Sequence, residues 1–127
     1  MATLPSAVSV VEVGPRDGLQ NESALISTAD KIAFVDRLTN AGLRAIEVSA
    51  FVSPKWIPQL KDAADVFAGI TRRPGTRYSA LVPNLIGLER ALGAGVTDVA
   101  IFTAASETFN QRNTRRSIEE SFATYRD

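Results

Sequence analysis

Short β-rich runs alternate with longer helical patterns along this chain, and this alternation limits the folds that the chain can adopt. The runs cover residues 8–13, 43–49, 77–82 and 97–103 and are rich in apolar residues. Runs of this kind are typical of parallel strands that are covered by helices. Strands joined by helical crossovers predict an α/β fold with the order βαβαβαβα.

Capping signals indicate where the helices begin. Ser27 with Asp30 resembles a capping box in which Asp replaces the usual Glu or Gln, and Ser117 with Glu120 matches the box. Asn84 is a further N-cap candidate. Apolar residues recur at helical spacing after Ser27, after Asn84 and again over residues 60–67. The sequence therefore predicts a helix in each interval between the β-rich runs and one after Ser117.

Two architectures are compatible with this order, namely an open doubly wound sheet and part of a (β/α)8 barrel. In the second run, alternation places Glu47 and Ser49 on one face of a strand. A carboxylate in the middle of a strand is unexpected in an open sheet that is covered by helices. In a barrel it can face the interior near the site, because substrates bind at the carboxyl ends of the strands. The pattern alone is equally compatible with a Glu47 that is salt-bridged or solvated at a sheet edge.

The strand chemistry favours the barrel. A complete barrel takes about 250 residues, and this chain has 127. We therefore predict a partial (β/α)8 TIM barrel of about four βα units, formed by residues 1–127. Neither a dinucleotide-binding fingerprint nor a Walker loop follows the first run.

The composition narrows the class of protein. Fourteen basic residues balance fourteen acidic ones, which argues against nucleic acid or an anionic membrane as a partner. The sequence contains no cysteine, so neither a disulfide framework nor a thiolate metal site is expected. Residues 1–7 lack the pattern of a signal or transit peptide, and no apolar run reaches the length of a membrane span. We expect a soluble cytoplasmic protein.

The segment of residues 14–27 is long for a connection between a strand and a helix, which indicates a functional role. Within it, the Asp17 carboxylate can bind a divalent metal, and the Arg16 guanidinium can stabilise negative charge on a substrate oxygen. Adjacent residues do not easily pair in an extended segment, so we expect them to have different partners. An equally compatible structural alternative has Asp17 capping the amides of Gly18 and Leu19, with Arg16 in a surface ion pair.

Longer motifs carry a resemblance to a known family. Residues 11–22, VEVGPRDGLQNE, resemble the opening motif of the hydroxymethylglutaryl-CoA lyases, and FVSPKWIPQ at residues 51–59 continues the match. Shorter matches follow at residues 46–48, 83–85, 93–95, 101–102, 104–107 and 117–121. The Arg-Asp-Gly core alone is shared with isopropylmalate and homocitrate synthases. The resemblance covers nearly the whole chain and corresponds to the N-terminal half of these metal-dependent TIM-barrel lyases of the pyruvate carboxyltransferase-like superfamily.

The resemblance implies roles for three residues. Asp17 would be a ligand of a catalytic Mg2+ or Mn2+, Arg16 would bind the substrate and stabilise the enolate at its thioester carbonyl, and Glu47 would line the lumen and organise the acid–base network. The implied reaction cleaves an acyl-CoA, 3-hydroxy-3-methylglutaryl-CoA, to acetyl-CoA and acetoacetate, as in leucine degradation and ketone-body formation. A metal on the substrate's hydroxyl and carboxylate oxygens favours the alkoxide, and a fixed cation acts best at the thioester oxygen that receives the electrons.

Two features of the family are absent from this sequence. The family completes its metal site with two histidines and an asparagine from later strands and uses a cysteine on a mobile loop, whereas this chain contains no histidine and no cysteine. We therefore expect an inactive fragment, completed by a C-terminal half or by further copies of the chain. The alternatives are a non-catalytic half-barrel that binds a partner and a fragment of a related acyl-CoA condensing enzyme; residues 51–59 argue against the latter.

Overall fold

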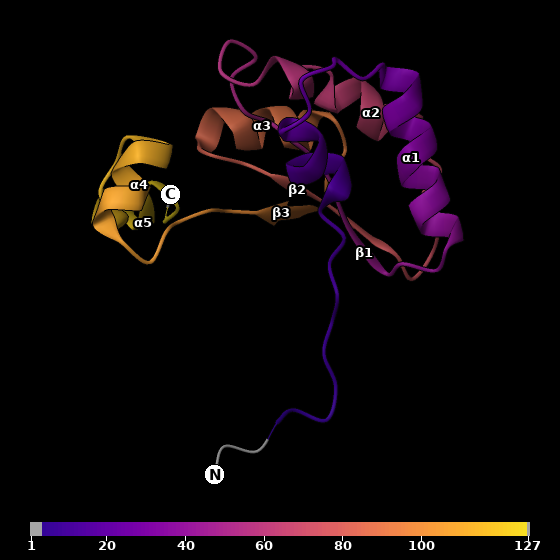
Figure 1. Cartoon of the computed structure of the whole chain (residues 1–127), viewed down its shortest axis with the longest axis horizontal. Coiled ribbons are helices and arrows are strands. Elements are labelled where there is room, and N and C mark those ends of the chain that lie inside the picture. The colour runs from indigo at the N-terminus through magenta and orange to yellow at the C-terminus, as the bar shows by residue number, and fades with distance from the viewer. Residues whose placement is uncertain (1–3, 127) are drawn as a thin grey trace.

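Helices and parallel strands alternate along residues 4–126, the part of the chain that the computed structural model describes. In chain order the elements are the π-helical turn η1 (Gly14–Gly18), α1 (Thr28–Asn40), β1 (Ala45–Ala50), the 3-10 turn η2 (Pro58–Leu60), α2 (Ala63–Gly69), β2 (Arg77–Leu81), α3 (Leu85–Gly93), β3 (Asp98–Ala100), α4 (Glu107–Thr114) and α5 (Ile118–Thr124). Helices α1, α2 and α3 lie on one side of the sheet, whereas α4 and α5 lie together beyond β3 (Figure 1).

The described strands form one parallel sheet in the order β1-β2-β3. Ile46 pairs with Tyr78, and Ala80 of β2 pairs with Val99 of β3. The register shifts between Glu47 and Ser49, where β1 carries an irregularity. Parallel strands joined through helices confirm the predicted α/β fold.

The hydrophobic core lies between the sheet and the helices on its covered face. Ile46 and Val48 of β1 are buried in it together with Val35 of α1 and Phe67 of α2. Each such side chain contributes about 1.5–3 kcal/mol through its burial. Glu47 alternates with the two core residues of β1 and lines a cavity on the other face.

The predicted strand over residues 8–13 does not form. Within this run Glu12 alone makes a bridge to β1. Its N–H donates to the carbonyl of Ala45 (2.9 Å), and its own carbonyl accepts the N–H of Glu47 (2.8 Å). Val8 lies in the same run and is 78% exposed. Valine favours a strand only where neighbours pair its backbone and bury its side chain, and in the described structure these neighbours exist at Glu12 alone.

The predicted helix starts are confirmed. The hydroxyl of Ser27 accepts the N–H of Asp30 (3.1 Å), and the side chain of Asn84 caps α3 in the same way. Ser117 and Glu120 form a complete capping box. The pair at α1 is half a box, because the Asp30 carboxylate accepts the Ser27 hydroxyl (2.7 Å), and a shorter side chain replaces the usual Glu.

Helix α4 is a feature that the sequence did not predict, since it has almost no apolar stripe. Its N-terminal signal is Ser106, whose hydroxyl accepts the N–H of Phe109 (3.3 Å). The fully buried Asn110 joins α4 to α5 by donating to the carbonyl of Arg116 (2.9 Å) and to the hydroxyl of Ser121 (2.8 Å). A buried, hydrogen-bonded polar side chain therefore holds this pair of helices together.

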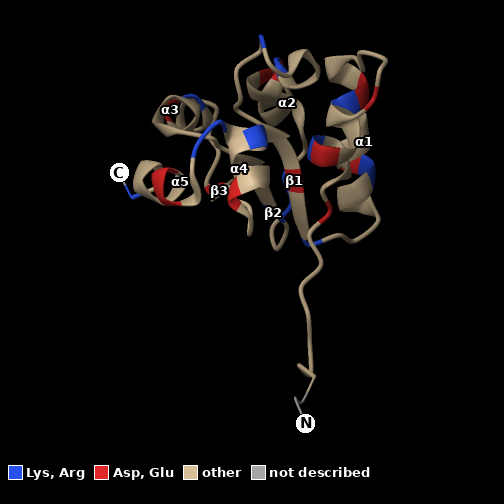
Figure 2. Cartoon of the chain, turned by 60° about the vertical axis from the view of Figure 1, so that its left-hand side comes forward, with Lys and Arg blue, Asp and Glu red and all other residues tan. Residues whose placement is uncertain are grey.

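Basic and acidic residues are interspersed over the helices and loops (Figure 2), as equal numbers of the two charges would suggest. Within residues 4–126, no helix combines the length and the apolar composition needed to cross a bilayer. Because the basic and acidic residues are equal in number, electrostatic effects at a site in this chain depend on local ion pairs rather than on the net charge.

Candidate active site

The turn η1 positions the Arg-Asp pair directly after the Glu12 bridge. The carbonyl of Val13 accepts the N–H groups of Arg16 (3.1 Å), Asp17 (2.7 Å) and Gly18 (3.3 Å), so the chain reverses tightly there. The Glu12 carboxylate accepts the N–H of the next-but-one residue, Gly14 (2.6 Å). Glu12 therefore stabilises the turn itself.

Arg16 joins the other two residues that the sequence singled out, Asp17 and Glu47. Its Nη1 donates to the Oδ1 of Asp17 (2.8 Å), and its Nε donates to the Oε1 of Glu47 on β1. The expectation that Arg16 and Asp17 have different partners is therefore wrong in part, because η1 is a tight turn in which adjacent side chains can converge. The alternative in which Asp17 caps the next two amides is also not observed, since the N–H of Gly18 donates to Val13 and that of Leu19 to earlier carbonyls of η1.

Glu47 connects this ion-pair group to a cavity on the face of the sheet away from the helices. The cavity has a volume of about 250 Å³, and its lining includes Glu47, Ser79 and Asp98 from the three strands. Arg16 is mostly buried, with 18% of its side chain exposed, and the Asp17 side chain is 54% exposed. Arg16 and Asp17 do not line this cavity, so Glu47 is the member of the group that reaches it.

The donor set for a divalent metal is incomplete in this part of the chain. Asp17 offers an exposed carboxylate on a hydrogen-bonded turn, which suits a hard cation as one oxygen ligand. Residues 4–126 contain no group of three or more Asp or Glu side chains that could hold an ion, and the sequence has no histidine or cysteine. The described residues therefore fit the role of one ligand and do not make up a metal site by themselves.

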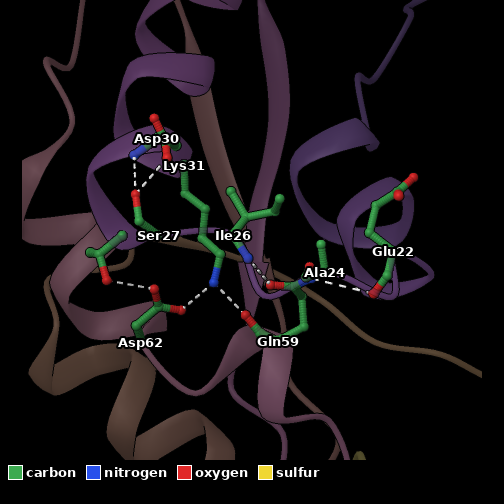
Figure 3. Close-up of polar contacts among 9 residues, drawn as sticks. Glu22, Ala24, Ile26, Ser27, Asp30, Lys31, Gln59 and Asp62 are labelled. Carbon is green, nitrogen blue, oxygen red and sulfur yellow. Dashed lines mark hydrogen bonds and ion pairs between the residues drawn. The ribbon is translucent and has the colours of Figure 1, made fainter.

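A buried ion pair between α1 and the segment after η2 is a feature that the sequence analysis missed. Lys31 of α1 is 5% exposed, and its Nζ donates to the carbonyl of Gln59 and to the Oδ1 of Asp62 (2.7 Å). Thr28 donates its hydroxyl to the other Asp62 oxygen (2.7 Å). Figure 3 shows the Lys31 side chain pointing to Asp62 and Gln59. The sequence did contain an indication of this pair. Lys31 precedes the buried Val35 by one helical turn, so a charged residue lies on the apolar stripe of the helix.

The electrostatics of this pair favour ionised Asp62. Burial by itself raises the pKa of Asp62. The hydrogen bonds from Lys31 and Thr28 and the charge of Lys31 act in the opposite direction, and the net result is a pKa below the ordinary value of 3.8. The carboxylate is therefore charged at neutral pH and remains paired with the buried ammonium.

Loops at the carboxyl ends of two strands also contact each other. Trp56 lies in the connection after β1 and is 60% exposed. Arg115 ends α4 in a left-handed conformation (φ 59°), and its guanidinium carbon lies 4.3 Å from the centre of a Trp56 ring. This cation–π contact links the segment after β3 to the segment after β1 at the end of the sheet where barrels carry their sites.

Comparison with known proteins identifies relatives over nearly the whole chain. Residues 7–127 match the family described as HMGL-like. A 3-hydroxy-3-isohexenylglutaryl-CoA/hydroxy-methylglutaryl-CoA lyase of Pseudomonas aeruginosa is 59% identical over 96% of this chain, and the match covers 41% of that protein. The chain thus spans about two fifths of the length of the curated relatives that it matches.

Solved structures agree with this placement. The crystal structure of hydroxymethylglutaryl-CoA lyase from Pseudomonas aeruginosa has a TM-score of 0.91 at 59% identity and covers 96% of this chain and 41% of that one. The structure of an HMG-CoA lyase from Acinetobacter baumannii, in complex with coenzyme A and 3-methylmalate, has a TM-score of 0.89 at 41% identity. The match covers 98% of this chain and 41% of that protein. These neighbours confirm that the parallel sheet is part of a (β/α)8 barrel.

Proposed function

Because this chain belongs to the HMGL-like family, we propose that residues 1–127 form the N-terminal half of the TIM-barrel domain of a carbon–carbon lyase. The reaction is the cleavage of 3-hydroxy-3-methylglutaryl-CoA to acetyl-CoA and acetoacetate, in the cytoplasm and in leucine degradation. The observation that carries the proposal is the Arg16 guanidinium, which is held between Asp17 and Glu47 at the turn that follows the Glu12 bridge.

Arg16 is the residue that stabilises the developing negative charge. Cleavage of the carbon–carbon bond moves an electron pair toward the thioester carbonyl, and its oxygen becomes enolate-like. A cation that is already oriented lowers the free energy of that state without reorganisation, and the effect is larger where water is excluded. Arg16 meets both conditions, because it is mostly buried and bonded through two of its nitrogens.

Glu47 has two roles in this proposal. Its carboxylate fixes the Nε side of Arg16 and so orients the guanidinium. It also lines the cavity on the open face of the sheet, where it is placed to organise the acid–base network of the site.

Asp17 is proposed as one ligand of a divalent cation, Mg2+ or Mn2+. When bound, such a cation supplies Lewis acidity at the substrate's oxygens. The remaining ligands come from outside the described residues, since these contain no group of three suitable side chains. The isolated chain is therefore proposed to be inactive until a C-terminal half, or further copies of the chain, complete the barrel.

The proposed partner is an acyl-CoA substrate, with no nucleic acid and no membrane involved. Support for the CoA portion comes from the Acinetobacter baumannii neighbour, whose structure contains coenzyme A. Support for the acyl portion comes from the name of the Pseudomonas aeruginosa relative, which includes hydroxy-methylglutaryl-CoA.

The test uses a lyase chimera, in which residues 7–127 of this chain replace the matching segment of the Pseudomonas aeruginosa relative. We expect Mg2+-dependent release of acetoacetate from 3-hydroxy-3-methylglutaryl-CoA by the chimera and none by the 127-residue chain alone. Arg16→Gln in the chimera should lower kcat by about 10²-fold or more, the range seen when one donor to a developing oxyanion is removed. A matched control is Arg112→Gln, which removes an exposed guanidinium on α4. An inactive chimera, or equal turnover in the Arg16 variant and the control, would show that the proposal is wrong.

A further inference from the structure

The segment that follows the Arg16–Asp17 turn is held mainly by the side chain of a distant residue. Gln59 lies in η2, after β1, and is 5% exposed. Its Oε1 accepts the N–H of Ile26 (3.0 Å), and its Nε2 donates to the carbonyl of Ala24 (2.7 Å) and, at 3.5 Å, to that of Glu22. The Gln59 amide thus pairs backbone groups of three residues in this connection, as a neighbouring strand does in a sheet (Figure 3).

Gln59 is itself fixed by the buried pair. The Lys31 ammonium bonds both to the backbone carbonyl of Gln59 and to Asp62, and Thr28 holds the second oxygen of Asp62. Burying an ammonium and a carboxylate is unfavourable unless both are fully hydrogen-bonded, and an apolar pair of similar size is often as stable. The benefit of this pair therefore lies in the fixed position of η2 relative to α1 rather than in net stability.

A continuous set of contacts leads from Gln59 to the turn. The Nδ2 of Asn21, immediately before the clamped residues, donates to the backbone carbonyl of Asp17 (2.7 Å). The N–H of Asn21 donates to the carbonyl of Gly18 (3.2 Å). At its other end the turn follows Glu12, which is bonded to β1. The Arg16–Asp17 turn is thus held at one end by the sheet and at the other by Gln59.

We propose that Gln59, fixed by Lys31 and Asp62, is a positioning residue that holds the Arg16–Asp17 turn in register with Glu47. The catalytic consequence rests on the proposed function, whereas the positioning of Arg16 does not. A displacement of about 1 Å at a reacting group can lower turnover by about 10²-fold, so loss of the clamp should reduce kcat more than KM.

The first test measures the position of Arg16 without any activity assay. In Gln59→Leu, which keeps the side-chain size but removes its hydrogen bonds, the Nε–H of Arg16 should exchange with water at least about 10-fold faster by NMR, because its contact with Glu47 opens more often. The matched control is Thr39→Val, which removes buried hydrogen bonds to Val35 (3.0 Å) and Tyr78 (3.1 Å) at the other end of α1.

Gln59→Glu is a second variant for the case in which Gln59→Leu does not fold. It also provides an intermediate step, because it removes only part of the hydrogen bonding. Its carboxylate can still accept the N–H of Ile26 but, when ionised, cannot donate to Ala24. Exchange of the Arg16 Nε–H should therefore lie between that of the wild type and that of the leucine variant. Equal exchange at Arg16 in the wild type and the Gln59 variants would overturn the positioning role.

The second test measures turnover in the lyase chimera. Gln59→Leu should lower kcat about 10–100-fold with KM within about threefold, whereas Thr39→Val should lose stability and keep kcat. A kcat that falls equally in both variants would assign Gln59 a purely structural role. If the unsubstituted chimera were inactive, the proposed function would fail, and the exchange of the Arg16 Nε–H would still decide the positioning role.

Discussion

Replacement of Asp62 by alanine isolates the energetic consequence of the buried ion pair. The Lys31 and Asp62 side chains are 6% and 11% exposed, and the Nζ and Oδ1 atoms lie 2.7 Å apart. In Asp62→Ala the ammonium of Lys31 keeps the carbonyl of Gln59 and loses its counter-charge. A buried charge without a partner destabilises a protein by about 3–5 kcal/mol, which is a large part of the roughly 5–15 kcal/mol that separates folded from unfolded domains.

The expected free-energy change translates into a measurable shift. With a denaturant slope of about 2 kcal/mol per molar urea, a loss of 3–5 kcal/mol lowers the urea midpoint by about 1.5–2.5 M. The double variant Lys31→Met/Asp62→Leu should recover most of this loss, because apolar side chains of similar volume carry no desolvation cost. The interaction is therefore expected to be strongly non-additive in a double-mutant cycle.

The assay is urea unfolding followed by far-UV circular dichroism at pH 7. Asp65→Ala is the matched control, since this exposed carboxylate lies one turn further along the same region, and its removal should change the free energy of unfolding by less than about 0.5 kcal/mol. If Asp62→Ala unfolded at the same urea concentration as the control, or if the double variant were less stable than Asp62→Ala, the reasoning on the buried charge would be refuted.

Three further predictions follow from the same contacts. The pKa of Asp62 is lower in the folded state than in the unfolded state, so the folded state binds fewer protons there. The stabilising contribution of Asp62 should be complete at neutral pH and should decrease as the pH falls below about 4, so the urea midpoints of the wild type and Asp62→Asn should differ less at pH 3 than at pH 7. Asn110→Leu should lower the free energy of unfolding by about 2–4 kcal/mol, since it leaves several buried polar groups unpaired; thermal unfolding measures this, the exposed Asn113→Leu is the control, and equal melting temperatures would contradict it. Asp17→Ala should weaken Mn2+ binding to the lyase chimera about 10-fold or more in a calorimetric titration, and an unchanged affinity would remove Asp17 from the ligand set.

The secondary structure was predictable where it depends on contacts within a few residues. The capping residues Ser27, Asn84 and Ser117 each bond to an amide three positions along the chain, so the helices begin where the sequence indicates. The run of residues 8–13 has the composition of a strand, yet it pairs at Glu12 alone. A strand depends on partners that are far away in the sequence, and its own residues do not supply them.

The candidate site was predictable as a set of residues and not as an arrangement. Arg16, Asp17 and Glu47 were singled out from motifs and strand alternation, and the structure brings the three together. That Arg16 pairs with its neighbour follows from the shape of η1, which sequence patterns did not predict. Gln59 was part of a recognised motif, but no feature of that motif indicated that its amide group holds the segment after the turn.

The sequence by itself determined the α/β class, the starts of α1, α3 and α5 and the family resemblance, because these depend on neighbouring residues and on unbroken motifs. Tertiary structure decided which charged side chains meet. Arg16 reaches Glu47 across 31 positions, Lys31 reaches Asp62 across 31, and Gln59 reaches Ile26 across 33. Contacts over such separations exist only after the sheet and its helices have packed, since packing brings these segments together and excludes the water that would otherwise solvate the charges.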